Sequence, residues 1–229
     1  MDVEILARPA NAAASVTLDA GEVCTAEGGA MIAMSADIDV ETRVSRNERG
    51  GGFLRGMARR LGGEGIFLNH YTAGPGGGTV YLSTPLPGDM QLIELDGTVP
   101  IRVQNGSFVA HESGVRMEIS WGGLKNVLSG ENLVWLRLDG SGKVVINAFG
   151  AIYPIQVDGE YIVDTGNIAA FEETLDYRIT RAGKSLVGAF AGGEGFVCRF
   201  SGTGTVWCQT HADRVFGAKL TPYLIPKKN

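Results

Sequence analysis

The stretch that decides the fold is GSFVAHESGVRMEIS, residues 106–120, because it recurs further along the chain as GNIAAFEETLDYRIT, residues 166–180. The glycine, alanine, glutamate and apolar positions of the two copies coincide at a constant offset (166 − 106 = 60 residues). A weaker third copy, GAMIAMSADI, occupies residues 29–38. We name this segment unit B. Internal repetition of this kind indicates one supersecondary element that is used several times.

A second segment, unit A, also occurs three times and alternates with unit B. Its copies open with GGEG at 62–65, SGEN at 129–132 and GGEG at 192–195. The order along the chain is B, A, B, A, B, A, so a third complete pair forms only if the last A lies beside the first B. The sequence therefore predicts a closed all-β barrel or prism with pseudo-threefold symmetry, in which closure removes the unpaired sheet edges.

Unit B is expected to end in a strand and unit A to form a β-hairpin. Apolar and polar residues alternate, with the period of two that half-buried strands show, over residues 38–44, 115–121 and 175–180. Glycine-rich segments between two β-rich runs predict hairpin turns at residues 74–78, 139–142 and 201–204. We expect one all-β domain over residues 1–229, with an insertion at 45–61 and a C-terminal tail at 211–229. The tail is apolar and proline-flanked, and we expect it to pack on the barrel or across a subunit interface.

Composition excludes several classes of protein. The chain holds 20 Lys and Arg against 25 Asp and Glu, a net charge of −5, whereas nucleic-acid-binding domains are normally basic. No apolar stretch reaches the roughly 20 residues of a membrane span. The three cysteines, Cys24, Cys198 and Cys208, have no CxxC spacing, so we expect reduced thiols and a cytoplasmic location. The acidic N-terminus lacks the pattern of a targeting segment, so we expect neither a secretory signal nor a transit peptide.

The insertion at 45–61 is the strongest candidate for a contact surface. Six arginines and one acid lie between Arg43 and Arg60 in a chain that is otherwise acidic, and the apolar residues share one face at helical spacing. This pattern is typical of a basic amphipathic element that contacts a membrane or a protein partner; a short helix capping the barrel is the alternative, and the one that we favour. The candidate binding residues are Phe53, Leu54, Arg55, Met57, Arg59 and Arg60.

Recognised catalytic spacing is missing from the sequence. The three histidines, His70, His111 and His211, lack the spacing of a cupin metal site, and there is no Gly-x-Ser-x-Gly elbow or phosphate loop. Equivalent glutamates open the three A units and could converge on a cation, although turn carboxylates commonly accept backbone hydrogen bonds instead. These weak metal candidates are Glu64, Glu131 and Glu194. We assign no catalytic residue and expect no cofactor.

Several motifs together give the chain a specific resemblance. They are GGAMIAMS at 28–35, RRLGGEGIFLN at 59–69, PGD at 87–89, GSFVA at 106–110, GE at 130–131, GEYIVDTG at 159–166 and QT at 209–210. The chain resembles the mitochondrial-biogenesis family named for altered inheritance of mitochondria. His211 stands where the family usually has an arginine after the Gln-Thr pair.

The resemblance implies an all-β pseudo-barrel, grouped with double-stranded β-helix or tryptophan-attenuation-protein-like folds. It also implies a link to inner-membrane organisation in eukaryotes and no established enzymatic activity. We therefore expect a non-enzymatic scaffold or interaction protein, alone or as a homo-oligomer, that acts in membrane-associated or assembly processes. Its partner would be a protein or a membrane surface, not a nucleic acid. The alternative is a small-ligand or metal-binding β-barrel with enzymatic activity.

Overall fold

The fold is all-β, with a single short α-helix among the residues that the structure describes. The structure is a computed structural model that describes residues 1–45, 66–121, 134–181 and 196–224. The strands are β1 Asp2–Leu6, β2 Ala13–Leu18, β3 Val23–Glu27, β4 Met31–Met34, β5 Ile38–Ser45, β6 Ile66–Ala73, β7 Gly78–Leu82, β8 Met90–Asp96, β9 Ile101–Gln104, β10 Phe108–Glu112, β11 Val115–Trp121, β12 Val134–Asn147, β13 Ile152–Asp164, β14 Ile168–Glu172, β15 Asp176–Arg181 and β16 Phe196–Gln209. Short 3₁₀ turns cover Asn105–Ser107 and Thr165–Asn167.

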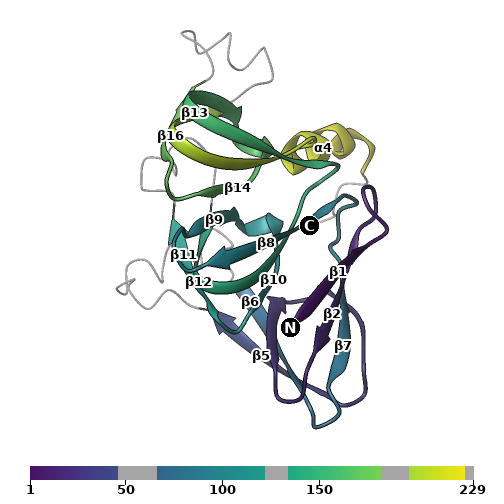
Figure 1. Cartoon of the computed structure of the whole chain (residues 1–229). Helices are drawn as coiled ribbons and strands as arrows, with labels where there is room; N and C mark the ends of the chain where they lie inside the picture. Colours follow the sequence, from purple (N-terminus) through teal and green to yellow (C-terminus); the bar gives the residue numbers. More distant parts are fainter. Residues whose placement is uncertain (46–65, 122–133, 182–195, 225–229) are drawn as a thin grey trace, which may run out of the picture.

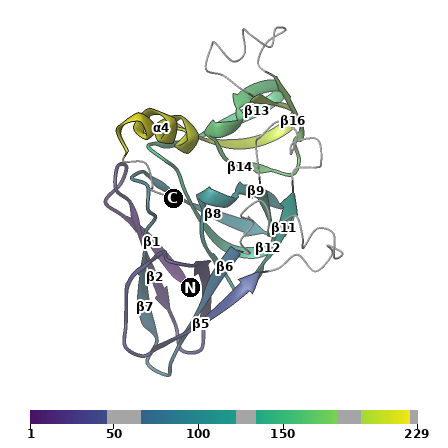
Figure 2. The ribbon, with the colours of Figure 1, turned by 180° about the vertical axis from the view of Figure 1, so that it is seen from behind.

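The strands form an elongated molecule rather than a ring. A four-stranded sheet has the order β1-β2-β7-β4, and a larger sheet runs β13-β16-β14-β9-β12-β10-β3-β6-β5. Figures 1 and 2 show β13 and β16 at one end of the molecule and β1, β2, β7 and β5 at the other. Three clusters of buried apolar side chains follow one another along this length.

Each core cluster fills the space between strands that face one another. The first lies between the four-stranded sheet and strands β3, β6 and β10, with Val16, Val80 and Tyr71 fully buried. The third is aromatic, with Trp135 and Phe171 at its centre. Burial of a large apolar side chain contributes about 1.5–3 kcal/mol, so these clusters supply most of the favourable free energy of folding.

The strands predicted at the ends of the B units are confirmed. The three alternating segments correspond to β5, β11 and β15. In β11 the side chains of Arg116 and Glu118 are exposed, whereas Val115 is buried. Alternation with period two thus located these strands correctly, because one face of each is wet.

The hairpins predicted for the A units are wrong. Residues 139–142 lie inside β12 and residues 201–204 lie inside β16, each a continuous strand of 14 residues. In the first A unit, β6 and β7 are separate strands, but β6 pairs with β3 and β5 whereas β7 pairs with β2 and β4. The glycines carry the chain from one set of partners to another: Gly140 and Gly202 have φ of 111° and 115°, a conformation that only glycine adopts without strain.

The closed barrel is also wrong, and pseudo-threefold symmetry is not confirmed. Ring closure required the first B unit to lie beside the last A unit. Instead, among the described strands, β16 pairs only with β13, β14 and β15. Three separate core clusters are buried one after another along the larger sheet. Burial of the core therefore does not require the two ends of this sheet to pair with each other.

The C-terminal tail contains a helix that the sequence analysis did not predict. Helix α4 covers Asp213–Leu220 and leads into a 3₁₀ turn at Thr221–Tyr223. Asp213 in the first turn and Lys219 in the last turn complement the helix dipole. Pro222 is the second residue of the 3₁₀ turn, and because proline cannot continue the α-helical hydrogen bonding, the α-helix ends before it.

Candidate interaction surfaces

The site residues chosen from the sequence are not placed by this structure. The amphipathic candidates Phe53, Leu54, Arg55, Met57, Arg59 and Arg60 lie outside the described residues. The carboxylates Glu64, Glu131 and Glu194 also lie outside them. Both predictions therefore stay predictions, and the surfaces below are built from the parts of the chain that are described.

Two internal junctions join the three core clusters through the same kind of strand pairing. At the first, β3 pairs antiparallel with β10, with Ala26 opposite Ala110. At the second, β9 pairs antiparallel with β14, with Val103 opposite Ala170. In each case a strand of one cluster, β3 or β9, pairs with the edge of the first strand of a later B unit, β10 or β14. Backbone hydrogen bonds across these edges hold successive clusters together.

One polar side chain at or just after the end of the first strand of each B unit ties that unit to the following A unit. Ser35 Oγ accepts a hydrogen bond from the backbone N–H of Thr79 at 2.9 Å. Glu112 Oε2 accepts from the N–H of Lys143 at 2.9 Å, and Glu172 Oε2 accepts from the N–H of Thr205 at 2.7 Å. A carboxylate acceptor makes such a bond stronger than a neutral one.

The glycines that precede these donors leave room for the acceptors. A Cβ on Gly142 would lie 3.0 Å from Glu112 Oε2, and a Cβ on Gly204 would lie 3.1 Å from Glu172 Oε2. These close approaches explain why glycine and glutamate occur at matching positions of the repeated sequence. The matching glutamates of the B units are thus structural.

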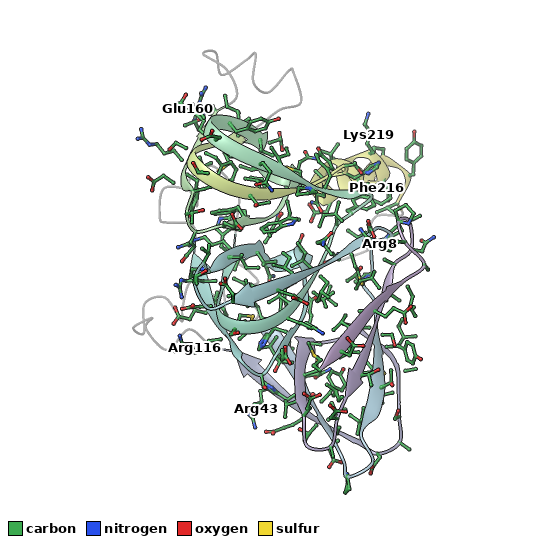
Figure 3. The ribbon with its side chains drawn as sticks, viewed as in Figure 1. Arg8, Arg43, Arg116, Glu160, Phe216 and Lys219 are labelled. Carbon is green, nitrogen blue, oxygen red and sulfur yellow. The ribbon has the colours of Figure 1, made fainter. Side chains whose placement is uncertain are left out.

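Helix α4 and the residues that follow it form a C-terminal apolar surface, which includes the two most exposed large apolar side chains of the described chain, Tyr223 and Leu224. The exposed fractions of the C-terminal apolar surface are Val215 55%, Phe216 43%, Leu220 41%, Tyr223 85% and Leu224 64%. Figure 3 shows Lys219 projecting from α4 on the side away from the sheets. No residue of α4 is buried, so its large apolar side chains all stay partly in contact with solvent.

A dense set of contacts fixes where α4 begins. The side chain of buried Gln209 accepts from the N–H of Phe149 at 2.9 Å and donates to the carbonyl of Gly166 at 2.9 Å. The ring of Phe149 lies 5.2 Å from that of His211 and 5.1 Å from that of Phe216. The helix is therefore presented in a defined orientation although its own apolar residues remain exposed.

Two strand ends are also apolar and exposed. All four residues of β4 are exposed, including Met31 at 42%, Ile32 at 59% and Met34 at 40%. On β13, Tyr161 is 44% and Ile162 is 48% exposed. Both strands stand at the end of a sheet. Exposed apolar edge strands are the surfaces on which chains add to one another.

Ionisable side chains gather on one face of β3, β6 and β10. The Nδ1 atom of His70 lies 2.9 Å from Thr25 Oγ1, and buried His111 hydrogen-bonds the carbonyl of Glu112 at 2.8 Å. Burial lowers the pKa of both histidines and raises the pKa of Glu27 to about 7. Among the described residues, no group of three His, Cys, Asp or Glu side chains could hold a metal ion. Neutral, half-buried groups of this kind suit structural packing.

A shallow polar hollow is lined by Arg102, Glu173, Leu175, Asp176 and Tyr177. Glu173 forms ion pairs with Arg102 at 2.7 Å and with Arg137 at 2.9 Å. The guanidinium of Arg102 also lies 5.9 Å from the centre of the Tyr177 ring. The charges in this hollow are largely satisfied by one another, so an anionic ligand would have to displace Glu173 from its partners.

The raised pKa of Glu27 gives a pH dependence that can be measured. The folded protein holds a proton on Glu27 at pH values where the unfolded chain has lost it, so the stability associated with this proton is present at low pH and lost as the pH rises from about 4.5 to about 7. We expect Glu27→Gln to raise the melting temperature at pH 8 relative to the parent, with a smaller effect at pH 5. Thermal unfolding at pH 5, 6, 7 and 8 measures this difference, with exposed Glu118→Gln as the control. A melting-temperature difference that stays constant across this range contradicts it.

Comparisons with known proteins show similarity over almost the whole chain. A family model described as "Mitochondrial biogenesis AIM24" matches residues 3–211. The chain belongs to the AIM24 family. This match confirms the resemblance that the sequence motifs indicated.

The crystal structure of protein SPYM3_0169 from Streptococcus pyogenes is similar to the AIM24-family chain, with a TM-score of 0.78 and 23% sequence identity. The likeness covers 97% of this chain and 99% of that chain, and at this identity it shows the fold alone. Among curated proteins, no match is found. Within the described part of the chain, no helix has the length and apolar character needed to cross a membrane.

The structure gives two of the AIM24-like motifs a structural role. In PGD, residues 87–89, the buried carboxylate of Asp89 forms two 2.8 Å hydrogen bonds with Arg8 and accepts another from the N–H of Met90. In QT, residues 209–210, Gln209 anchors the start of α4. The resemblance identified these motifs but not their contacts, because the bonds from Asp89 to Arg8 and from Gln209 to Phe149 and Gly166 join residues far apart in the chain.

Proposed function

We propose that this AIM24-family chain is a non-enzymatic scaffold that acts through protein contacts, with the C-terminal apolar surface of α4 as its main contact. The observation that carries the proposal is the combination of a fixed helix origin with five exposed apolar side chains beyond it. An apolar patch that stays in water lowers its free energy when a partner covers it. A rigid origin reduces the entropy lost when that partner binds.

Charge supports a protein partner with acidic groups at its rim. Arg214 and Lys219 lie on the same short helix as the apolar residues, although the chain is acidic overall. Interfaces commonly combine an apolar centre with a charged rim that orients the partner. The three cysteines are free and buried, which supports a reducing compartment and hence the cytoplasm as the site of action.

Site-specific photocrosslinking in living cells tests the contact. A photoreactive phenylalanine analogue at position 223 is expected to give covalent adducts with another protein. The same analogue at Tyr153, which is 44% exposed on β13, serves as the control and should give few. Val215→Asp should reduce the adducts at position 223 at least five-fold without changing the melting temperature. A chain that folds normally and gives no adduct at position 223 overturns the proposal.

The segment 45–61 is the second contact proposed, on the strength of its arginine-rich amphipathic sequence. Deletion of residues 45–61 is expected to leave the melting temperature nearly unchanged and to abolish association with the partner or with anionic phosphatidylglycerol vesicles. Flotation of the full chain and of the deletion variant with such vesicles separates the two outcomes. Equal flotation and equal adduct yield would show that the segment only caps the fold.

A further inference from the structure

The two internal junctions follow one rule of strand pairing. Opposite residues at the first junction are Ala26 and Ala110, Thr25 and His111, and Cys24 and Glu112. Opposite residues at the second are Val103 and Ala170, Arg102 and Phe171, and Ile101 and Glu172. From the first junction to the second, the residue numbers in the B-unit strand rise by 60 (170 − 110, from β10 to β14). The residue numbers in the strand that pairs with it rise by 77 (103 − 26, from β3 to β9). Both junctions are antiparallel and use corresponding positions.

The strands that correspond to a third junction are both present, but each lacks its partner among the described strands. The strand β4 matches β10 and β14: each pairs with the second half of an A unit, and each has a register shift at the same place, between Met31 and Ala33, Phe108 and Ala110, and Ile168 and Ala170. The end of β13 matches β9, because each pairs with the first half of the following long strand and precedes a 3₁₀ turn.

The free edges cannot meet within one chain in this structure. Glu160, just before the relevant end of β13, lies at one end of the molecule in Figure 3. The strand β7, with which β4 pairs, lies in the lobe at the other end in Figures 1 and 2. Among the described strands, each molecule therefore has one unpaired edge of each kind, and the two lie at opposite ends.

Side chains at these two edges are exposed, whereas the corresponding side chains at the internal junctions are buried. Tyr161, which is 44% exposed, corresponds to Cys24 and Ile101, which are 0% and 1% exposed. Met34, which is 40% exposed, corresponds to His111 and Phe171, which are 7% and 0% exposed. Side chains that are covered at both internal junctions are thus left in water only where the neighbouring strand is missing.

We propose that two copies of the chain join head to tail, with the end of β13 in one copy pairing antiparallel with β4 of the next. The register places Val163 opposite Ala33, Ile162 opposite Met34, and Tyr161 opposite Ser35. Backbone hydrogen bonds give the attachment its strength, and the exposed apolar side chains give it its register. Because the two surfaces differ, every added copy leaves one free β4 and one free β13, so the contact can propagate beyond a dimer.

This inference deepens the proposed function, on which it rests in taking the chain to act through contacts between proteins; it names a second copy of the chain as one partner. The contact is small, which places it among weak and transient interfaces. It is independent of α4, so the two contacts can fail separately.

Disulfide trapping between two variants of the full chain, each with one added cysteine, tests the pairing. The native thiols do not interfere, because burial raises the pKa of Cys24 and Cys198 to about 12 and of Cys208 to about 11. Met34→Cys and Ile162→Cys, mixed in equal amounts under mild oxidation, are expected to give a covalent dimer that contains one chain of each kind. Each variant alone should give less than a tenth of this yield.

A register control accompanies the test. Glu160→Cys replaces an exposed residue two positions from Ile162 on the same face of β13, and its partner in the proposed register is not Met34. Opposite residues in antiparallel strands are closer than diagonal ones, so the mixture of Glu160→Cys with Met34→Cys should crosslink at least five-fold less. Equal yields would overturn the register and with it the proposal.

Three further outcomes test the proposed pairing of β13 with β4 of a second copy. Ile162→Asp should raise the dissociation constant for self-association, measured by sedimentation equilibrium, at least ten-fold. Val215→Asp on α4 should leave the yield of the trapped dimer unchanged, which separates this contact from the one proposed above. Self-dimers of Met34→Cys alone, or capture of a different protein on Met34→Cys with no contribution from Ile162→Cys, would overturn the second copy as the occupant of β4.

Discussion

Gly88→Ala is expected to lower the free energy of unfolding by about 3 kcal/mol or more. A Cβ at this position would overlap the carbonyl oxygen of Ala148 and lie 2.8 Å from the backbone N of Gly150. The backbone here is held by bonds from Asp89 N–H to the Gly150 carbonyl at 2.8 Å and from Ala12 N–H to the Gly88 carbonyl at 2.8 Å. Because the obstacle is backbone rather than a flexible side chain, the strands must separate to admit the methyl group.

Urea denaturation followed by tryptophan fluorescence measures this effect, and Gly106→Ala is the matched control. A Cβ on Gly106 would meet no heavy atom within 4 Å, and its φ lies outside the left-handed region. We expect the control to change the free energy of unfolding by less than about 1 kcal/mol. Equal denaturation midpoints for the two variants would show that the approach of residue 88 to Ala148 is not needed for folding.

Phe171→Ala is expected to destabilise the fold by about 3–5 kcal/mol. The Phe171 ring is completely buried, and its centre lies 5.1 Å from Trp135, 5.0 Å from Tyr177 and 5.1 Å from Phe200. Truncation would remove three edge-to-face contacts and leave a cavity that rigid strands cannot close.

The same truncation at an exposed ring provides the comparison. Phe67 is 49% exposed, so Phe67→Ala should lower the free energy of unfolding by less than about 1 kcal/mol. Phe171→Leu, which keeps most of the apolar volume, should fall between the two. Thermal unfolding of the three variants gives the order, and a Phe171→Ala protein as stable as Phe67→Ala would contradict the role given to the aromatic cluster.

Local patterns in the sequence were sufficient to find the strands at the ends of the three B units. The alternation over residues 38–44, 115–121 and 175–180 predicted β5, β11 and β15. These signals succeed because the faces of a strand differ in solvent exposure every second residue. The hairpin turns predicted at the glycine-rich segments 139–142 and 201–204 were wrong, because a glycine with positive φ can bend a continuous strand as readily as it can end one.

The arrangement of the strands could not be derived in the same way. Symmetry in the sequence suggested a ring, but only the pairing between distant residues, such as Ala26 with Ala110, shows that the units follow one another along an open sheet. The candidate surfaces were missed for a related reason. A run of four apolar residues at Met31–Met34 is equally compatible with a buried strand, and only the strand order shows that β4 has a free edge.

Strand β12 takes part in all three apolar clusters: it supplies Val145 to the first, Leu136 and Val144 to the second and Trp135 to the third. Dividing the protein between two clusters would therefore remove core residues from at least one of the two fragments. Melting at one end should spread through this shared strand to the other, so the chain ought to unfold in a single cooperative step and resist division into smaller autonomous fragments.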